Sequence, residues 1–294
     1  MPAATVVIAT RNRAALLSDC LNHLGSQTAR GTFEVVVVDN GSTDDTATVV
    51  HRHMAAMPEL RLLHVEDPNR SKARNAGIAA AQGSWLIFCD DDTVAPPQFV
   101  AAHLAAHERH EPRVVTGPIV NVANALALAA PAARHYSRAY FCTCNASVSK
   151  AAVDSVGGFD EQYDLYGWED TDLGLRLRAK GLRRIFDWQA YIFHIKPPAA
   201  DAFARRQALA IEKGTMAARF VRKSPTWPVK LATGAYAANF LRADLMTWAP
   251  LRRLYERAIR SADNNSALKT FAAEALIDAA YVNALKAALR AAHE

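Results

Sequence analysis

The chain has 294 residues, of which 51% are hydrophobic and 21% are charged. It is too apolar and too mixed in charge to be disordered, and its 13 glycines and 13 prolines exclude a collagen-like or proline-rich chain. The four cysteines are too few and too scattered for a disulfide scaffold, so we expect reduced, mostly buried thiols. The length suits one large α/β domain with a smaller unit.

The net charge of +5 is unevenly distributed. Residues 197–294 contain 15 lysines and arginines against 8 acidic residues, a net of +7, whereas residues 1–196 have a net charge of −2. The first residues lack the pattern of a signal peptide, and no uncharged apolar run reaches the roughly 18 residues of a membrane span. The sequence therefore predicts a cytoplasmic protein, with a position at the inner face of the membrane as the alternative.

Up to about residue 120, short apolar runs alternate with segments of helical periodicity. The predicted strands are Thr5–Thr10, Phe33–Asp39, Leu60–Val65, Ser84–Cys89 and Arg113–Val120, and the predicted helices are Arg13–Ser26, 43–56, Ser71–Ala81 and Pro96–Arg109. This order predicts an α/β fold with an open, mostly parallel sheet and helices on both faces. Ligands of such sheets bind beyond the carboxyl ends of the strands.

Beyond residue 121 the pattern is less regular, and the alanine-rich segment Ala123–Ala133 favours a helix or a loose lid. The other predicted elements are the strands Tyr140–Ser149, Arg183–Phe186 and Ala190–Ile195, the helices Ser149–Val156 and Trp168–Lys180, and tail helices over 201–223, 228–247, 250–261 and 265–292. We expect a sheet domain over residues 1–198, followed by a helical C-terminal extension over residues 199–294.

Three adjacent carboxylates, those of Asp90, Asp91 and Asp92, follow a buried strand. Because like charges repel, such a cluster favours a bound cation, and Mg²⁺ or Mn²⁺ takes carboxylate oxygens and bridges to phosphates. The alternative is a solvated acidic turn before the next helix. The chain contains neither a GxGxxG sequence after the first strand nor a P-loop, so a bound diphosphate would be neutralised by a metal and by basic side chains such as Arg74.

Two further pairs of polar residues stand at the ends of predicted elements. Asp39 and Asn40 end a strand of valines, where they would read a base or a ribose or simply form a turn. Glu169 and Asp170 open a helix after Trp168; acids are stabilised there, but a partly desolvated carboxylate beside a ring is also a general base. His194 is either a core histidine or a further metal ligand.

Five blocks of sequence, in order, resemble a family 2 glycosyltransferase of the GT-A fold: VVIATRNRAALL, FEVVVVDNGSTDDT, SKARNAGIAAAQGSWLIFCDDDTVAP, VGGFDEQY and GWEDTDLGLRL. They span about residues 4–196, and the last block also resembles the C-terminal motif of β-1,4-galactosyltransferases. The resemblance implies a nucleotide-sugar half over about residues 1–120 and an acceptor half over about residues 121–198.

The resemblance also implies roles for individual residues. On the donor side, the nucleoside pocket would contain Thr10, Asp39 and Asn40. Arg74 would approach the diphosphate, and Asp90 and Asp91 would face the ribose and the donor sugar. Asp92 and His194 would hold the metal, Asp170 would be the base that deprotonates the acceptor, Glu169 would hydrogen-bond the acceptor, and Trp168 would stack on a sugar. Arg11, which stands where relatives have Tyr or Phe before Asn12, would bind the donor without that ring's contact to the base.

The implied activity is transfer of a sugar from a nucleotide-diphosphate sugar to a hydroxyl acceptor, with inversion and with Mn²⁺ or Mg²⁺. The acceptor would be a glycan, a lipid-linked saccharide or a small molecule. A nucleotidyltransferase would need a glycine-rich loop after the first strand, and the remaining alternative is a non-catalytic nucleotide-sugar-binding or scaffold protein. The basic tail favours either peripheral contact with anionic lipid or a helical cap or homodimer contact. No nucleic-acid-binding module is present.

Overall fold

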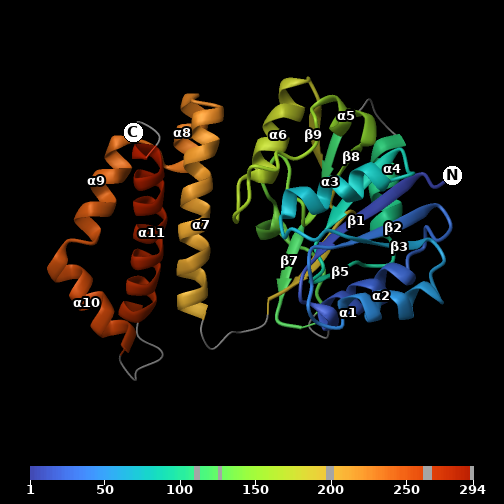
Figure 1. The fold of residues 1–294 in the computed structure, drawn as a ribbon, viewed down its shortest axis with the longest axis horizontal. Helices are drawn as coiled ribbons and strands as arrows, with labels where there is room; N and C mark the ends of the chain where they lie inside the picture. The colour runs from blue at the N-terminus through green and yellow to red at the C-terminus, as the bar shows by residue number, and fades with distance from the viewer. Residues whose placement is uncertain (109–112, 125–127, 197–201, 261–266, 292–294) are drawn as a thin grey trace. The chain divides into compact units, whose positions relative to one another are not determined.

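The computed structural model describes residues 1–108, 113–124, 128–196, 202–260 and 267–291. The described chain divides into two units, one of residues 1–164 and 169–197 and one of residues 165–168 and 198–294. The first contains both sheets and the second contains the C-terminal helices (Figure 1).

A seven-stranded sheet forms the centre of the first unit, in the order β3-β2-β1-β4-β8-β6-β9. Its strands are β1 (Ala4–Thr10), β2 (Phe33–Asp39), β3 (Leu60–His64), β4 (Trp85–Cys89), β6 (Arg113–Thr116), β8 (Asn145–Ser149) and β9 (Arg183–Phe186). All paired strands are parallel except β8, which runs antiparallel to β4 and to β6. The prediction of a mostly parallel sheet is confirmed.

Helices cover both faces of this sheet, as predicted. They are α1 (Ala14–Gly25), α2 (Thr46–Met54), α3 (Arg70–Ala80), α4 (Phe99–Glu108), α5 (Lys150–Ser155) and α6 (Glu169–Ala179). Side chains alternate along each strand, so Val6 and Ile8 of β1 pack with α1, α2 and α4, whereas Val7 packs with α3, α5 and α6. Two apolar cores thus fix the sheet from both sides and hold the ends of its strands in place.

A second, three-stranded sheet has the order β5-β10-β7 and consists of β5 (Thr93–Val94), β7 (Ile119–Val122) and β10 (Ile192–Ile195). The prediction of one strand over Arg113–Val120 is therefore wrong, because the chain leaves the large sheet after Thr116 and enters the small one at Ile119. Gly117 and Pro118 lie between them, and proline has no N–H to donate to a sheet ladder. A Cβ at Gly117 would lie 1.8 Å from the carbonyl oxygen of Ala190, so only glycine fits this crossing.

Other predicted boundaries also change. The strand expected over Tyr140–Ser149 begins only at Asn145, and the segment Ala123–Ala133 shows no α-helix among its described residues; residues 125–127 lie outside them. A short 3₁₀ helix, η1 (Ala133–His135), follows that segment.

The second unit contains α7 (Ala202–Lys223), α8 (Trp227–Thr233), α9 (Ala237–Met246), α10 (Ala249–Arg260) and α11 (Ala267–Arg290). The single helix expected over 228–247 is wrong, since Gly234 adopts φ +71° and ends α8. The beginnings or ends expected at 201, 261, 265 and 292 lie outside the described residues. α7 and α11 approach closely at Gly214, where a Cβ would lie 2.2 Å from the carbonyl oxygen of Tyr281. No described helix has the length and apolar character needed to span a bilayer.

Candidate active site

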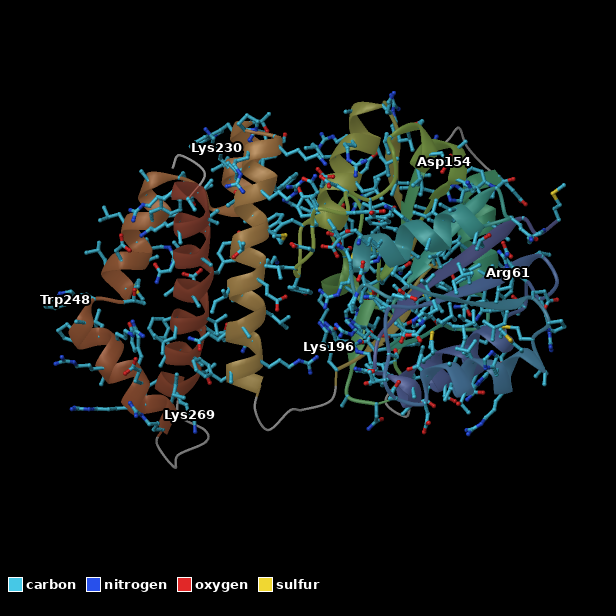
Figure 2. All side chains as sticks on the ribbon, viewed as in Figure 1. Arg61, Asp154, Lys196, Lys230, Trp248 and Lys269 are labelled. Carbon is cyan, nitrogen blue, oxygen red and sulfur yellow. The ribbon has the colours of Figure 1, made fainter. Side chains whose placement is uncertain are left out.

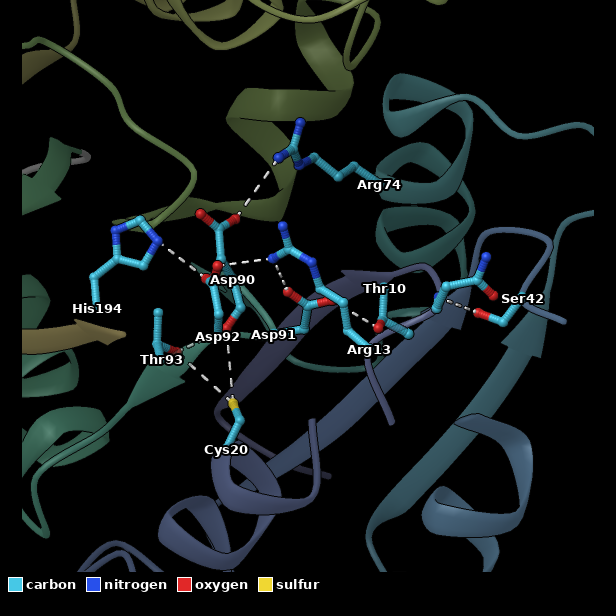
Figure 3. A network of polar contacts seen from close by, with 11 residues as sticks. Thr10, Arg13, Cys20, Ser42, Arg74, Asp90, Asp91, Asp92, Thr93 and His194 are labelled. Atoms are coloured by element: carbon cyan, nitrogen blue, oxygen red, sulfur yellow. Dashed lines mark hydrogen bonds and ion pairs between the residues drawn. The ribbon is translucent and has the colours of Figure 1, made fainter. Parts of the chain in front are cut away.

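The carboxyl ends of β1, β2 and β4 meet at one edge of the large sheet, as expected from the parallel pairing of β1 with both neighbours. The acidic residues Asp90, Asp91 and Asp92 form the turn between β4 and β5, and Figure 3 shows the side chains gathered around it. We call this turn the acidic turn. Of the residues predicted for the site, Thr10, Arg74 and His194 contact it directly.

Asp91 is the most enclosed member of the acidic turn and is buried. Its Oδ2 accepts a hydrogen bond from the hydroxyl of Thr10 at 2.7 Å, and its Oδ1 accepts one from Arg13 at 2.8 Å. Burial raises the pKa of Asp91, and the contacts with Arg13 and Thr10 offset only part of that rise. Asp91 is therefore bound into the protein on both oxygens, and its position is fixed by β1.

Arg13, just before α1, is a site residue that the sequence analysis missed. Its Nη1 lies 2.8 Å from Oδ1 of Asp91 and 2.7 Å from Oδ2 of Asp92, so one cation joins both carboxylates. Burial lowers the pKa of Arg13, but the two carboxylates outweigh burial and leave the pKa raised. Arg11, the arginine singled out for the donor, is exposed, and its predicted role stays a prediction.

Asn12 explains why Arg13 rather than Arg11 turns inward. It adopts φ +53°, an uncommon left-handed conformation in which asparagine is tolerated. Its N–H donates to the hydroxyl of Ser42 at 2.9 Å, and its Oδ1 accepts from the N–H of Thr43 at 2.7 Å. The turn after β1 is thereby tied to the turn after β2, directly before Arg13.

Asp92 and His194 meet as predicted, with Oδ1 of Asp92 3.1 Å from Nε2 of His194. Burial raises the pKa of Asp92, but the contacts with His194 and Arg13 outweigh burial and leave the pKa below its usual value. His194 reaches the turn because β10 pairs with β5, and the N–H of Ile195 donates to the carbonyl oxygen of Asp92 at 2.8 Å.

His194 also belongs to a group of three residues that could bind a metal, namely Asp90, Cys144 and His194. One ligand atom from each lies within 4.8 Å of the other two. Carboxylate oxygen, thiol sulfur and imidazole nitrogen are all ligands of divalent transition metals, so the donor set fits such an ion.

Arg74 on α3 connects the acidic turn to α6. It is buried, and its Nη1 lies 2.9 Å from Oε1 of Glu169 while its Nη2 lies 3.8 Å from Oδ1 of Asp90. Burial lowers the pKa of Arg74, but Glu169 and Asp90 outweigh burial and leave the pKa raised. Arg74 is therefore a buried arginine of the site and not a solvated residue on the surface of a helix. Glu169 is buried as well and uses Oε1 for Arg74, so its expected contact with an acceptor stays a prediction for Oε2.

Asp170, the expected general base, lies in the first turn of α6. Its pKa is raised to about 6, first by burial and then by the charge of Glu169, while Arg74 and the hydrogen bonds from Thr171 act in the opposite direction. The backbone N–H of Thr171 donates to Oδ1 at 2.7 Å, which leaves Oδ2 available to a substrate. A carboxylate with this pKa is mostly ionised at neutral pH and is still basic enough to accept a proton.

Asp39 and Asn40 lie beside Thr10 at the end of β2, since Asp39 pairs with Thr10 and the N–H of Asn40 donates to the carbonyl oxygen of Thr10. Both are buried and both support loops. Oδ1 of Asp39 accepts from the N–H of Ser42 at 2.9 Å, and Oδ1 of Asn40 accepts from the N–H of Asn69 at 2.8 Å. The turn-forming alternative is confirmed, and their contact with a nucleoside stays a prediction.

Trp168 belongs to the second unit, although it precedes Glu169 in the chain. Its ring stacks on Phe220 of α7 with centroids 5.6 Å apart, and its Nε1 donates to the carbonyl oxygen of Lys213 at 3.0 Å. The expected stacking on a sugar stays a prediction for a ring that already packs against a helix.

The four cysteines are all free, and Cys20, Cys89 and Cys144 are buried, as expected. Burial raises the pKa of Cys144 well above its usual value, and burial raises that of Cys142 to about 12. These thiols were not predicted as site residues, because their neighbours in the sequence do not indicate which strand lies beside them.

Two family models match the chain. The model of glycosyl transferase family 2 matches residues 5–159, and a model described as the N-terminal domain of galactosyltransferase matches residues 125–200. Together they cover the acidic turn, the Glu169–Asp170 pair and His194.

Similar characterised proteins include the validoxylamine A glucosyltransferase of Streptomyces hygroscopicus subsp. jinggangensis, 34% identical over 223 residues, which cover 62% of this chain and 53% of that protein. A PGL/p-HBAD biosynthesis glycosyltransferase of Mycobacterium bovis is 34% identical over 122 residues, covering 40% of this chain and 47% of the relative. The chain thus spans about half the length of these relatives.

Solved structures share the fold. The mannosyltransferase PcManGT from Pyrobaculum calidifontis, in complex with GDP-Man and Mn²⁺, matches with a TM-score of 0.65 at 20% identity, over 100% of this chain and 88% of that one. Residues 1–349 of S. aureus TarS, in complex with UDP-GlcNAc, match with a TM-score of 0.61 at 18% identity, over 99% of this chain and 92% of that one. At these identities the likeness establishes the fold, which is GT-A.

Proposed function

This chain belongs to glycosyl transferase family 2, and on that basis we propose that it moves a sugar from a nucleotide-diphosphate sugar to a hydroxyl acceptor with inversion. The observation that carries the proposal is Asp170, a carboxylate with a pKa of about 6. Its neighbour Glu169 contacts Arg74, and Arg74 in turn contacts Asp90 of the acidic turn. Relatives named as glucosyltransferases and fold neighbours in complex with GDP-Man or UDP-GlcNAc support it.

Asp170 is the general base of this proposal. It takes the proton from the acceptor hydroxyl while the acceptor oxygen attacks the anomeric carbon and the nucleoside diphosphate departs from the opposite side. Because attack and departure occur on opposite faces, the anomeric configuration inverts. Arg74 lies between Glu169 and Asp90, so its positive charge offsets both carboxylates, and in this proposal it also stabilises the diphosphate.

Asp92 and His194 would hold a divalent ion, Mn²⁺ or Mg²⁺, with Asp90 beside them. The carboxylates and the imidazole suit such an ion, and their contacts already place them together. When bound, the ion would act as a Lewis acid that stabilises the charge on the departing diphosphate. Asp91 contributes differently, since Thr10 and Arg13 hold both of its oxygens and it orients the acidic turn.

We further propose that part of the second unit contacts anionic lipid, near a lipid-linked acceptor. Leu241 and Leu245, one turn apart on α9, are 60% and 62% exposed, and Trp248 after the helix is 66% exposed (Figure 2). Arg252 and Arg253 follow in α10. Exposed apolar side chains next to arginines suit the boundary between lipid tails and anionic headgroups. The lipid would take up the apolar side chains, and its headgroups would pair with the arginines.

A donor screen tests the proposed activity. The protein is incubated with a panel of nucleotide sugars, Mn²⁺ and hydroxyl acceptors, and released nucleoside diphosphate and the anomeric configuration of the product are measured. We expect acceptor-dependent release from at least one donor and a product of inverted configuration. Binding of a donor with no release in any combination would instead favour the alternative, a non-catalytic nucleotide-sugar-binding or scaffold protein.

A further inference from the structure

Cys144 comes to the acidic turn through the pairing of two strands. β4 and β8 are antiparallel, and Cys89 at the end of β4 pairs with Asn145 at the start of β8. The next residue beyond each end is Asp90 on one strand and Cys144 on the other. This cross-strand position places the thiol beside the carboxylate, although the two residues are 54 positions apart in the chain.

Three strands therefore deliver three different donor atoms to one place. Asp90 follows β4, Cys144 precedes β8 and His194 lies in β10, and their ligand atoms lie within 4.8 Å of one another. In Figure 3, His194 and Asp90 lie side by side above β5. Cys144 is buried and free, so no disulfide withholds its sulfur.

The chemistry of this donor set differs from that of carboxylates alone. Mg²⁺ favours oxygen ligands, whereas a thiolate together with an imidazole suits Zn²⁺, Co²⁺ and other thiophilic ions. A sulfur ligand would therefore change which ions the site selects, and not only how tightly it holds them.

We propose that Cys144 is a ligand of the divalent ion together with Asp90 and His194, so that the site prefers thiophilic ions to Mg²⁺. On binding, the S–H bond breaks, the sulfur electron pair forms the bond to the ion and the proton passes to solvent. The inference rests on the proposed function only in that both place a metal at the acidic turn.

Absorption spectra of the protein titrated with Co²⁺ test the proposal, because a sulfur ligand gives a charge-transfer band in the near ultraviolet that oxygen and nitrogen ligands do not give. We expect this band in the native protein. Cys144→Ser should abolish it while the visible bands of bound Co²⁺ remain. Cys142→Ser is the matched control, because Cys142 is a neighbouring thiol outside the three-residue group, and it should keep the band.

Affinity gives a second measurement that does not depend on activity. Cys144→Ser should weaken Zn²⁺ binding by at least about tenfold and change Mg²⁺ binding by less than about twofold, since oxygen replaces sulfur as the donor. Circular dichroism establishes that the variant is folded. If the variant does not fold, absence of the sulfur band from the native protein would still overturn the proposal.

Two results are informative in different ways. If Co²⁺ binds the native protein with visible bands but no sulfur band, or if the sulfur band survives in Cys144→Ser, Cys144 is not a ligand and the proposed glycosyltransferase is unaffected. If, in the presence of nucleoside diphosphate, the protein binds none of Co²⁺, Mn²⁺ and Zn²⁺, the metal site of the proposed function is contradicted. The assignment of Cys144 as a ligand is then contradicted as well.

Discussion

At the scale of single residues, two arginines govern the charges of the site. Arg13 joins Asp91 to Asp92, and Arg74 joins Glu169 to Asp90. Carboxylates that are close together repel one another unless cations compensate their charge. The two guanidinium groups supply that compensation permanently, because arginine stays protonated at any physiological pH. A divalent ion that binds as proposed would therefore enter a site that is already partly neutralised.

The pH dependence of transfer follows from Asp170. A general base acts only when ionised, and with a pKa of about 6 the ionised fraction of Asp170 grows as the pH rises through that value. We expect kcat, measured at saturating substrates between about pH 5 and 8, to rise and then level off. A kcat that is constant over this range, or that falls, would remove Asp170 from the role of base.

Removing Arg13 should strengthen metal binding. In Arg13→Gln, no cation bridges Asp91 and Asp92, so an incoming Mn²⁺ meets two uncompensated carboxylates. We expect Mn²⁺ to bind about threefold to tenfold more tightly, as measured by calorimetry or by electron paramagnetic resonance. Arg11→Gln is the control, since Arg11 is exposed and its charge is screened. Weaker binding in Arg13→Gln would show that Arg13 supports the metal site instead of competing with it.

At the scale of elements, α4 and β8 share a buried polar cluster. His103 on α4 lies between the hydroxyl of Ser147 and Oδ1 of Asn145, at 2.8 and 3.0 Å. His107, one turn further, lies 2.8 Å from the same hydroxyl and stacks on Trp85 of β4 with centroids 3.8 Å apart. Burial lowers the pKa of His103 to about 4 and that of His107 to about 3. Both histidines are therefore neutral in the folded protein.

Lowering the pH should reduce the stability of the fold through these two buried histidines between α4 and β8. The unfolded histidines titrate near pH 6.5 and the folded ones far lower, so between those values the unfolded state binds more protons and stability falls as the pH falls. We expect His107→Phe, which keeps the ring on Trp85, to reduce the loss of unfolding free energy between about pH 7 and 5. The reduction should be on the order of 1–2 kcal/mol in urea unfolding followed by circular dichroism.

His51→Phe provides the comparison for that experiment, because His51 is exposed on α2. It should retain the pH dependence of the native protein. If His107→Phe also retains it, the histidine is not kept neutral by burial.

Prediction of the strands succeeded where the local sequence alone determines their bounds. Phe33–Asp39 and Arg183–Phe186 are observed with the predicted bounds, and every residue of the former is buried. The errors arise where tertiary structure decides. Thr116 and Ile119 are parts of one apolar run, but they lie in different sheets because the chain crosses at Gly117.

The same distinction applies to the site. Asp90, Asp92, Arg74, Glu169 and His194 were found because each lies in one of the five sequence blocks or directly after an apolar run, and the structure brings all of them together. Arg13 was missed because the choice between two nearby arginines depends on the left-handed turn at Asn12. Cys144 was missed because only strand pairing places it beside Asp90.

At the scale of the whole molecule, charge and chemistry belong to different parts of the chain. Residues 1–196 have a net charge of −2 and contain the acidic turn, whereas residues 197–294 have a net charge of +7 and contain the exposed apolar residues of α9. The surplus positive charge therefore has no part in the reaction chemistry that we propose. Its role in our proposal is the contact with anionic lipid.

Vesicle sedimentation tests that assignment. The double variant Leu245→Ser with Trp248→Ser removes apolar surface without changing the charge, and we expect it to lose binding to vesicles that contain anionic lipid. The native protein should bind such vesicles and should not bind purely zwitterionic ones. Trp188→Ser serves as the control, because Trp188 is an exposed tryptophan of the first unit. Undiminished binding of the double variant, or a native protein that sediments with neither vesicle, would contradict the lipid contact.

The central claim is that Asp170 removes the acceptor proton, and Asp170→Asn tests it most directly. The folded pKa of Asp170 lies above the usual value of 3.8, so ionising it costs stability as the pH rises through about 6, and asparagine avoids that cost. The variant should therefore be folded at neutral pH. Asp154→Asn, an exposed aspartate on α5, is the matched control.

With the donor identified by the screen above, transfer rate and donor affinity are measured for the native protein and both variants. We predict that Asp170→Asn lowers kcat by at least about 100-fold, the contribution typical of a general base, while the donor Kd changes by less than about threefold. Asp154→Asn should match the native protein in both. Transfer by Asp170→Asn at close to the native rate would contradict the account.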